Sequence, residues 1–209
     1  MSAPASSGIV WASGIVWAPL RLEAWALRLG APGLPVVRCG LGPARAEAAA
    51  RARASQPGAW LVLGLCGATD PRLRAGDVFV PDAVRLPGGG DRRLSAASLR
   101  AALADAGFAF AEGLLASADH VVRGSERAAF HAAGVRAVDM ESAWLAQHAG
   151  DRDLAVVRVV VDAPDQELRE AGFPLRAWRG LSTLRRLAPL ISNWMGSHAL
   201  PVTPLPAVR

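Results

Sequence analysis

Lysine is absent from this chain of 209 residues, in which all 23 basic residues are arginine. The formal net charge of +5 would ordinarily favour a nucleic acid or an anionic membrane as a partner. The arginines are scattered, however, and they are interleaved with 18 acidic residues. Since the chain is also rich in alanine, the arginines indicate a bias in residue usage more than a selected phosphate-binding surface. The lack of a clustered basic stripe argues against a nucleic acid partner.

Cysteine is scarce, and the two cysteines of the chain are Cys39 and Cys66. Each ends an apolar run, and neither stands in a metal or redox spacing such as C-x-x-C. We therefore expect two buried, reduced thiols, no metal site and no cofactor.

Long apolar runs are also missing. No run reaches the roughly 18 residues that a membrane-spanning helix needs. The stretch from Gly8 to Leu20 is long enough for the core of a signal peptide, but residues 1–7 carry no Arg or Lys and no persuasive cleavage site follows. We expect a cytoplasmic protein.

Apolar residues are abundant, at 52% of the chain against 20% charged residues, and this composition and length predict one globular domain. Short β-branched runs bounded by Gly, Pro or Asp predict strands at residues 35–39, 59–64, 77–81, 135–139 and 154–162. Alanine-rich stretches between them predict helices at residues 43–55, 95–106, 125–133 and 140–149. This alternation indicates an α/β layer architecture around a largely parallel sheet.

A longer helix is predicted near the end of the chain. Apolar residues recur there at spacings of three or four, at Leu175, Trp178, Leu181, Leu184, Leu187, Ile191 and Trp194. Arginines lie elsewhere around the helix, at Arg176, Arg179, Arg185 and Arg186. The helix is expected either to pack its apolar stripe on the sheet or to offer residues 175–194 as a basic amphipathic surface to an anionic membrane or a partner helix.

The stretch "CGLGPARAEAAA" at residues 39–50 has the pattern of a strand, a glycine turn and a helix that begins near Pro43. Backbone N–H groups at such a helix start can bind an anion, and Arg38 and Arg45 are near by. A plain strand-to-helix turn has the same pattern.

The stretch "LGLCGATDPRLRAGDVFVP" at residues 63–81 has the pattern of a strand that runs into Gly64 and Gly67, followed by a loop that leads to a second strand. Gly64 and Gly67 could line a ligand with their backbone N–H groups, or they could allow tight packing. The dinucleotide fingerprint G-x-G-x-x-G is absent, so a dinucleotide site is poorly supported.

Two further stretches place carboxylates at strand ends. "AVDMESAWLAQH" at residues 137–148 sets Asp139 and Glu141 where a strand passes into a helix, a position that also suits helix caps. "VVRVVVDAPDQ" at residues 156–166 ends an apolar strand in Asp162. Open α/β sheets bind ligands at such carboxyl ends, although a turn or cap aspartate fits equally well.

Taken in this order and separation, the four stretches resemble the purine nucleoside and uridine phosphorylase superfamily, which includes methylthioadenosine/adenosylhomocysteine nucleosidase and futalosine hydrolase. The resemblance covers about residues 14–167 and is most specific in "VDMES" followed by a strand that ends in Asp162. The wording "GLGPARAEAAARA", "DPRLRAGDVFVPDAV" and "AVDMES" is most similar to hopanoid-associated phosphorylases, which are associated with removing adenine from adenosylhopane. The resemblance implies a three-layer α/β fold with a mixed, largely parallel central sheet flanked by helices.

The resemblance also implies roles for single residues. Asp162 matches the family's general acid, which protonates or hydrogen-bonds the base near its N7, and burial at a strand end would help to hold its proton. Glu141 matches the glutamate that binds the ribose hydroxyls, and Met140 the methionine that packs against the sugar. Further substrate contacts are expected from Asp139, Cys66 and Gly67.

The nucleophile is phosphate in a phosphorylase and water in a nucleosidase, and the sequence leaves both open. Glu23 lies where the nucleosidase branch carries a water-activating glutamate, although an exposed helix glutamate is an equal alternative. Phosphate is a possible co-substrate, for which Gly64, Arg38 and Arg45 are the candidate ligands. The pattern departs from the family at "GLCGA", where many phosphorylases have a Ser or Thr hydroxyl, and at Val161, where many members have Ser.

A hexapeptide, SGIVWA, occurs twice in tandem at residues 7–12 and 13–18. Its even period puts the same residues on the same face of an extended chain. The resemblance requires one first strand, and the second copy is the one that leads towards Glu23. We therefore expect an N-terminal extension at residues 1–12, a single domain at 13–200 and an extended tail at 201–209.

The sequence thus predicts an enzyme that cleaves the N-glycosidic bond of a purine nucleoside, by phosphorolysis or hydrolysis. Its substrate is expected to be a small-molecule or lipid-linked nucleoside, and a homo-oligomer and peripheral membrane contact through residues 175–194 are expected from the resemblance. The alternatives are a methylthioadenosine/adenosylhomocysteine- or futalosine-type nucleosidase and, in another class, a non-catalytic nucleoside-binding protein.

Overall fold

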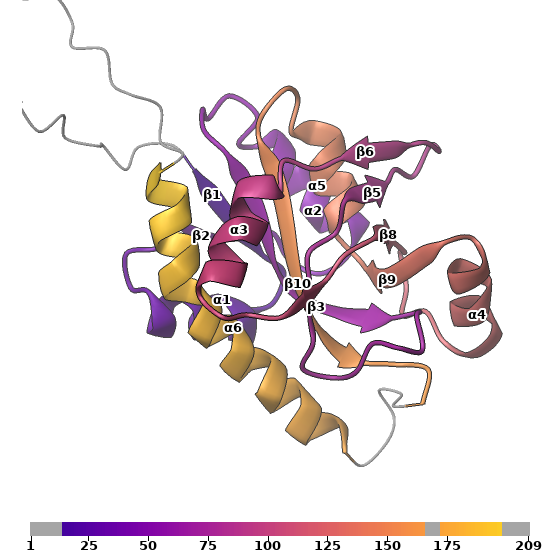
Figure 1. Ribbon diagram of the computed structural model, residues 1–209. Coiled ribbons are helices and arrows are strands. Elements are labelled where there is room, and N and C mark those ends of the chain that lie inside the picture. Colours follow the sequence, from indigo (N-terminus) through magenta and orange to yellow (C-terminus); the bar gives the residue numbers. More distant parts are fainter. Residues whose placement is uncertain (1–13, 166–171, 198–209) are drawn as a thin grey trace, which may run out of the picture.

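The computed structural model describes residues 14–165 and 172–197, in which strands and helices alternate along the chain (Figure 1). The strands are β1 (Ile15–Ala18), β2 (Val36–Arg38), β3 (Trp60–Ala68), β4 (Val78–Phe79), β5 (Ala83–Arg85), β6 (Asp91–Arg93), β7 (Phe110–Ala111), β8 (Leu114–Ser117), β9 (Val135–Asp139) and β10 (Leu154–Asp162). The helices are α1 (Arg21–Gly30), α2 (Pro43–Arg51), α3 (Ala97–Asp105), α4 (Gly124–Ala132), α5 (Ser142–His148) and α6 (Phe173–Ser197). The first hexapeptide copy and residues 201–209 lie outside the described residues, so the extension and the tail stay predictions.

Strand β3 is the centre of the sheet, because three strands pair with it. β10 runs parallel to it along its whole length. On the other edge, β1 pairs in parallel with its first residues and β9 pairs antiparallel with its last ones. Strands β8, β5 and β6 continue the sheet beyond β9, and β4 and β7 continue it beyond β10. Parallel pairs predominate and β4–β10, β3–β9 and β5–β6 are antiparallel, which confirms the mixed, largely parallel sheet.

Helices cover both faces of this sheet. Neighbouring residues of a strand point to opposite faces, so the side chains of β3 and β10 alternate between two cores. Leu61, Leu63 and Val157 belong to the core that α1, α3 and α6 cover. Trp60 and Val156 belong to the core that α2 and α5 cover. Figure 1 shows the two groups of helices on opposite sides of the strands, which confirms the predicted three-layer α/β fold.

The predicted strands and helices correspond to observed ones, with two differences. β10 has the predicted bounds, residues 154–162, and the second hexapeptide copy supplies β1. β3 continues past its predicted end at residue 64 to Ala68, so Gly64 and Gly67 both lie inside the strand. Strands β5 to β8 were not predicted, since each is only two to four residues long and depends on its neighbours in the sheet.

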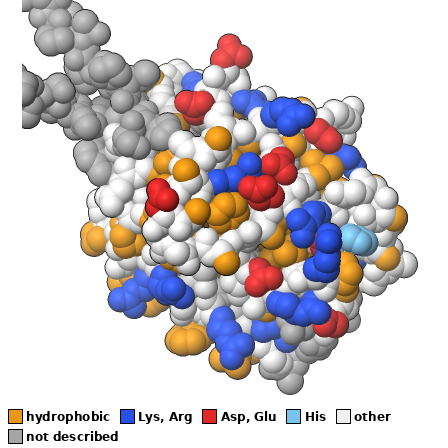
Figure 2. Space-filling model, viewed as in Figure 1, with side chains coloured by type: hydrophobic (Ala, Val, Ile, Leu, Met, Phe, Trp, Pro, Cys, Tyr) orange, Lys and Arg blue, Asp and Glu red, His pale blue; other side chains and the backbone are white. Residues whose placement is uncertain are grey.

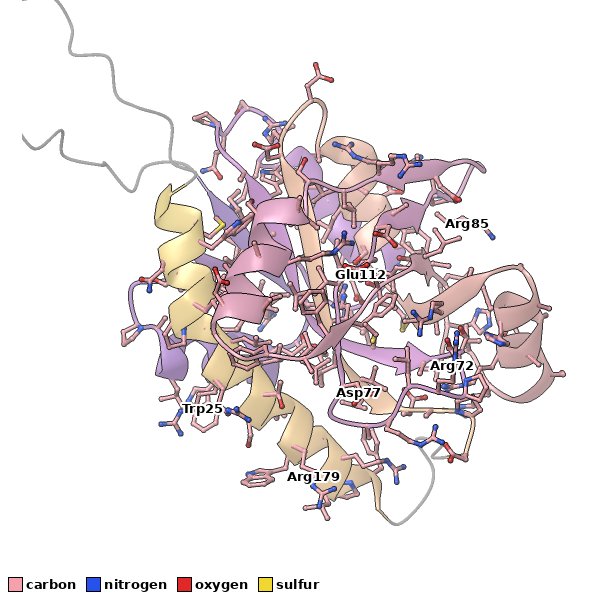
Figure 3. The ribbon with its side chains drawn as sticks, in the orientation of Figure 1. Trp25, Arg72, Asp77, Arg85, Glu112 and Arg179 are labelled. Carbon is pink, nitrogen blue, oxygen red and sulfur yellow. The ribbon has the colours of Figure 1, made fainter. Side chains whose placement is uncertain are left out.

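Helix α6 combines two environments along its length. Leu184, Leu187 and Ile191 in its later turns are fully buried against the sheet, as the packing interpretation expected. In its first turns Leu175 is 54% exposed and Trp178 is 64% exposed. Figure 3 shows Arg179 of α6 and Trp25 of α1 projecting outward from neighbouring helices. The membrane or partner contact predicted for residues 175–194 stays a prediction.

Charged side chains of both signs are interspersed over the face of the molecule in Figure 2. This arrangement is in line with the scattered arginines of the sequence, and the expected lack of a nucleic acid partner remains untested. Within residues 14–165 and 172–197, no helix is both long and apolar enough to cross a membrane.

Candidate active site

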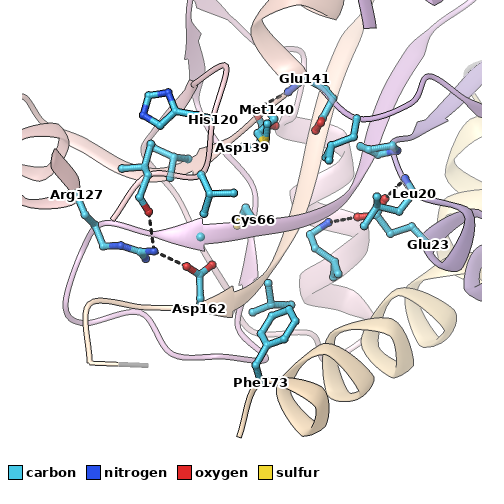
Figure 4. Close-up of a pocket in the computed structure, with 18 residues that line it drawn as sticks. Leu20, Glu23, Cys66, His120, Arg127, Asp139, Met140, Glu141, Asp162 and Phe173 are labelled. Carbon is cyan, nitrogen blue, oxygen red and sulfur yellow. Dashed lines mark hydrogen bonds and ion pairs between the residues drawn. The ribbon is translucent and has the colours of Figure 1, made fainter. Parts of the chain in front are cut away.

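A pocket of about 200 Å³ opens where the ends of several strands meet, the usual place for ligands in open α/β sheets (Figure 4). Its walls come from the loop after β1 and the start of α1, from the ends of β3, β9 and β10, from the segment before α4 and from the start of α6. Glu23, Glu141 and Asp162, which the sequence proposed as catalytic residues, all line it. The fold thus gathers three carboxyl groups from distant parts of the chain.

Glu141 stands between β9 and α5 and is only 2% exposed. Its Oε1 accepts a hydrogen bond of 3.0 Å from the backbone N–H of Gly42, and its Oε2 lies 3.6 Å from Nη2 of Arg158. Gly42 caps the start of α2 with a φ of 85°, a conformation that favours glycine. Burial raises the pKa of Glu141 to about 7 despite the opposing effect of Arg158. The carboxyl group therefore titrates close to neutral pH.

This contact changes the interpretation of the "GLGP" turn. The sequence analysis expected an anion at the start of α2, with Arg38 and Arg45 as its further ligands. In the structure the anion at that position is the carboxylate of Glu141. Arg38 is exposed at the end of β2 and Arg45 packs against Gly40, and neither of them lines the pocket as described.

Arg158 lies in the middle of β10 and is completely buried. It forms an ion pair with Asp139 and donates a hydrogen bond of 3.0 Å to the Oγ of Ser142. Asp139 also accepts hydrogen bonds from the hydroxyl of Ser117 and from the backbone N–H groups of Glu141 and Ser142. Asp139 lines the pocket as predicted, but its carboxylate is engaged in holding the corner between β9 and α5, which is the capping role that the sequence left open.

Glu23 is 1% exposed, so the alternative of an exposed helix glutamate is wrong. Its two carboxylate oxygens accept hydrogen bonds from the backbone N–H groups of Leu20, at 2.6 Å, and Leu65, at 2.8 Å. Burial raises the pKa of Glu23, while Arg158 and the two N–H groups oppose that rise. A carboxylate with a raised pKa is better suited to take a proton from water than an exposed one.

Gly64 makes room for these side chains. A Cβ atom at this position would lie 2.6 Å from Nη1 of Arg158 and 2.9 Å from Oε1 of Glu23. The sequence proposed Gly64 as a phosphate ligand or as a site of tight packing. It lies within β3 and is not among the described residues that line the pocket. The geometry therefore favours tight packing, because the side chains of Arg158 and Glu23 lie close to its Cα.

Asp162 ends β10 on the opposite side of the pocket. Its Oδ2 forms an ion pair with Arg127 of α4, and both side chains are at least nine-tenths buried. The sequence did not reveal this buried cation beside Asp162, and the expectation that burial helps to hold a proton on Asp162 stays a prediction.

The remaining predicted contacts also lie on the pocket wall. Met140, Cys66 and Gly67 all line it. A Cβ atom at Gly67 would lie 2.8 Å from Oδ1 of Asp162, so glycine allows that carboxylate to lie against β3. Burial raises the pKa of the Cys66 thiol, which therefore stays protonated and neutral.

Two arginines of the site were missed. Arg158 had a signal in the sequence, because a single charge inside the apolar run "VVRVVV" must find a buried partner. Arg127 had none, since "SERAAF" reads as an ordinary amphipathic helix. Among the residues that the structure describes, no group of three or more His, Cys, Asp or Glu side chains could hold a metal ion.

Comparisons with solved structures find the same fold in nucleosidases. The chain resembles 5′-methylthioadenosine/S-adenosylhomocysteine nucleosidase of Helicobacter pylori, with a TM-score of 0.74 and 17% identity over 87% of this chain and 99% of that one. It resembles futalosine hydrolase of the same organism, with a TM-score of 0.75 and 16% identity over 88% and 98%. For the nucleosidase of Neisseria meningitidis the TM-score is 0.72, with 18% identity over 86% and 98%. At identities this low, the similarity shows a shared fold alone.

The family itself follows from the sequence. No curated protein matches the chain significantly. A family model described as the phosphorylase superfamily matches residues 25–174, which is well over half of the chain. The match confirms the resemblance and, with it, the prediction of an enzyme. The chain belongs to the phosphorylase superfamily.

Proposed function

We propose that this enzyme hydrolyses the N-glycosidic bond of a purine nucleoside, with the ribose beside Glu141 and the base beside Asp162. The observation that carries the proposal is one pocket lined by four buried carboxyl groups, including that of Asp139. The other three are each held by their own partners: Glu23 by backbone N–H groups, Glu141 by Gly42, and Asp162 by Arg127. Cleavage breaks the bond between the anomeric carbon and the base nitrogen, and the bonding electron pair leaves with the base. The departing base takes up a proton, for which Asp162 is the proposed donor. Negative charges around the sugar stabilise the cationic transition state that results.

Glu141 is proposed to bind the ribose hydroxyls. Its two oxygens can accept from two neighbouring hydroxyl groups, and its position at the start of α5 is fixed by Gly42 and Arg158. Met140, which is partly exposed in the pocket, would pack against the sugar ring.

Water is the proposed nucleophile, and the local charge balance supports it over phosphate. On the sugar side three carboxyl groups, those of Glu23, Asp139 and Glu141, surround the single guanidinium of Arg158, which already pairs with Asp139. A phosphate dianion at this side of the pocket would compete with Asp139 for the guanidinium of Arg158. Glu23 would accept the proton of the attacking water, whose oxygen bonds to the anomeric carbon.

An apolar rim supports a nucleoside with an apolar 5′ substituent as the substrate. Leu20, Leu41 and Val121 line the pocket and are 38%, 47% and 41% exposed. Methylthioadenosine and a lipid-linked adenosine such as adenosylhopane both have this chemistry, and the second agrees with the hopanoid-associated resemblance of the sequence. Methylthioadenosine, which has the smaller substituent, is also part of the name of the Helicobacter and Neisseria nucleosidases.

The test is release of free base from adenosine, methylthioadenosine and a lipid-linked adenosine, each with and without phosphate. We expect release without phosphate and ribose rather than ribose 1-phosphate as the sugar product. Glu141→Gln and Asp162→Asn should each lower kcat/KM by about 100-fold or more. Glu47→Gln and Asp105→Asn, on the outer surfaces of α2 and α3, are the matched controls and should retain activity.

Several outcomes would contradict the proposal. A strict requirement for phosphate would make the enzyme a phosphorylase. Full activity of both site variants would place the chemistry elsewhere. Nucleoside binding without any turnover would identify a binding protein.

A further inference from the structure

Large apolar side chains that are exposed gather in two places within the described part of the chain. Leu20, Leu41 and Val121 form the apolar rim of the pocket. The others lie on the outer sides of α1 and of the first turns of α6, and they are Leu22, Trp25, Leu29, Leu175 and Trp178. We call this second group the α1/α6 face. A single exposed leucine is ordinary, but a cluster with two tryptophans indicates contact with an apolar partner.

The two helices of the α1/α6 face pack closely against each other. Gly30, the last residue of α1, lies so near α6 that a Cβ atom there would collide with the carbonyl oxygen of Arg185 and would lie 2.8 Å from Cβ of Ala188. Figure 3 shows Trp25 of α1 and Arg179 of α6 projecting outward on the same side of the molecule. The exposed side chains of the two helices therefore form one surface.

The exposed charges on these helices have one sign. α6 contains no Asp or Glu, and the single acidic residue of α1 is the buried Glu23. Arg21, Arg28 and Arg179 are exposed, and none of them forms an ion pair with another residue that the structure describes. Arg100, in contrast, pairs with carboxylates of its neighbours. The surface around the α1/α6 face is therefore both apolar and basic, and it complements an apolar partner with negative charges at its surface.

A hollow of about 580 Å³ on the outer side of α1 offers a place for a phosphate group. Its lining residues are Arg21, Leu22, Ala24, Trp25, Arg28 and Arg38. Arg28 is held there, because its Nη2 donates a hydrogen bond of 2.7 Å to the carbonyl of Val36. A guanidinium can bind a phosphate through two parallel N–H groups, and an indole ring suits the boundary between lipid headgroups and acyl chains. The hollow thus has the chemistry that binds the headgroup of an anionic phospholipid.

Both helices begin at the pocket. Leu20, the residue before α1, and Phe173, the first residue of α6, line the pocket wall (Figure 4). The starts of the two helices therefore connect the apolar rim of the pocket with the α1/α6 face. A bilayer that covers this face would lie next to the rim.

We propose that the α1/α6 face docks the enzyme on an anionic lipid bilayer. The two tryptophans insert at the level of the headgroups, and the arginines beside them bind lipid phosphates. A nucleoside whose 5′ substituent is embedded in the bilayer then reaches the pocket along the apolar rim. Docking is independent of the reaction, whereas this choice of substrate class rests on the proposed function.

The experiment is co-sedimentation of the full chain with vesicles of phosphatidylcholine alone and of phosphatidylcholine mixed with phosphatidylglycerol. We expect binding to the mixed vesicles only, and weaker binding as the salt concentration rises. The double variant Trp25→Ala, Trp178→Ala should lower the binding constant by about tenfold or more. Arg21→Gln and Arg179→Gln should each lower it about fivefold. Arg93→Gln, which changes an exposed arginine of β6, is the matched control and should bind like the wild type.

Turnover gives a second measurement. The altered residues do not line the pocket as described, so each variant should cleave water-soluble adenosine at the wild-type rate. Cleavage of a lipid-linked adenosine in mixed vesicles should fall in parallel with vesicle binding. Such a split between the two substrates would not result from a general loss of stability.

Three results would overturn the inference. The first is absence of binding to mixed vesicles, or equal binding to both kinds of vesicle. The second is binding that the double tryptophan variant leaves unchanged. The third is a wild-type dimer in sedimentation velocity that dissociates in the double tryptophan variant, because a second copy of the chain would then cover the face. Failure to cleave any nucleoside, with vesicle binding as expected, would instead refute the proposed function and leave the docking surface in place.

Discussion

The two ends of the pocket use the same kinds of side chain in different proportions. At the end proposed to hold the base, called the base end, one carboxyl group, Asp162, has one arginine, Arg127. At the end proposed to hold the sugar, called the sugar end, Glu23, Asp139 and Glu141 share Arg158. Burial raises the pKa of both glutamates there, because one cation cannot offset three buried acids. The ratio of buried carboxyl groups to arginines thus differs between the two ends, and the end with the higher ratio is the one where both glutamates have raised pKa values.

The largest effect should come from removing the shared cation. Arg158→Met leaves Asp139 without its ion-pair partner at a completely buried position, and we expect a loss of about 3 to 5 kcal/mol in the free energy of unfolding. Urea denaturation at pH 7 measures it. Arg179→Met, an exposed arginine of α6, is the matched control and should change stability by less than about 0.5 kcal/mol. A similarly small loss for Arg158→Met would mean that the sugar end does not depend on this charge.

A second prediction concerns pH. The pKa of Glu141 is raised to about 7 in the folded state, above its ordinary value of 4.5. Between these values the folded protein binds more protons than the unfolded chain, so this group stabilises the fold at low pH and loses that contribution as pH rises through 7. Because of this group, the wild type should lose on the order of 2 to 3 kcal/mol of unfolding free energy between pH 5 and 8, and Glu141→Gln should not show that loss. Unfolding free energies measured across that range test it, with Glu47→Gln as the control, and identical slopes in wild type and Glu141→Gln would contradict it.

The smallest effect is expected from crowding the sugar end without changing its charge. In Gly64→Ala the added methyl group meets Arg158 and Glu23, and we expect destabilisation of about 1 to 3 kcal/mol together with reduced turnover. Gly88→Ala is the matched control, since a Cβ there has no neighbour within 4 Å. Thermal unfolding and kcat provide the measurements. Wild-type values in Gly64→Ala would show that the two charged groups can shift freely.

Much of the fold could be predicted from local pattern. β10 is a continuous apolar run, and its bounds follow from that run alone. The spacing of Leu184, Leu187 and Ile191 predicted the buried stripe of α6. Periodicity could not show that Trp178, which belongs to the same stripe, is exposed. The short strands β5 to β8 could not be predicted, because pairing between distant segments defines them.

The site could be predicted less completely. Glu141 and Asp162 stand at strand ends, where position along the chain already suggests a ligand. Glu23 could be named but not oriented, because its burial depends on Arg158 and on a strand more than forty residues away, as its bond to Leu65 shows. The partner of Asp162 is Arg127, and no spacing rule connects a helix residue to a strand end 35 positions later.

The hydrogen bond from Gly42 to Glu141 joins two requirements that proteins often separate. It links the start of α2 to the start of α5, and so it helps to hold together the helical layer on one side of the sheet. The same carboxylate is the proposed ribose ligand. A substitution at Gly42 that changes the stability of this layer therefore also changes the position of the Glu141 carboxyl group. A substitution of Glu141 that changes activity likewise removes a contact between α2 and α5. Laboratory evolution of this enzyme should find few changes at these two positions that alter one property alone.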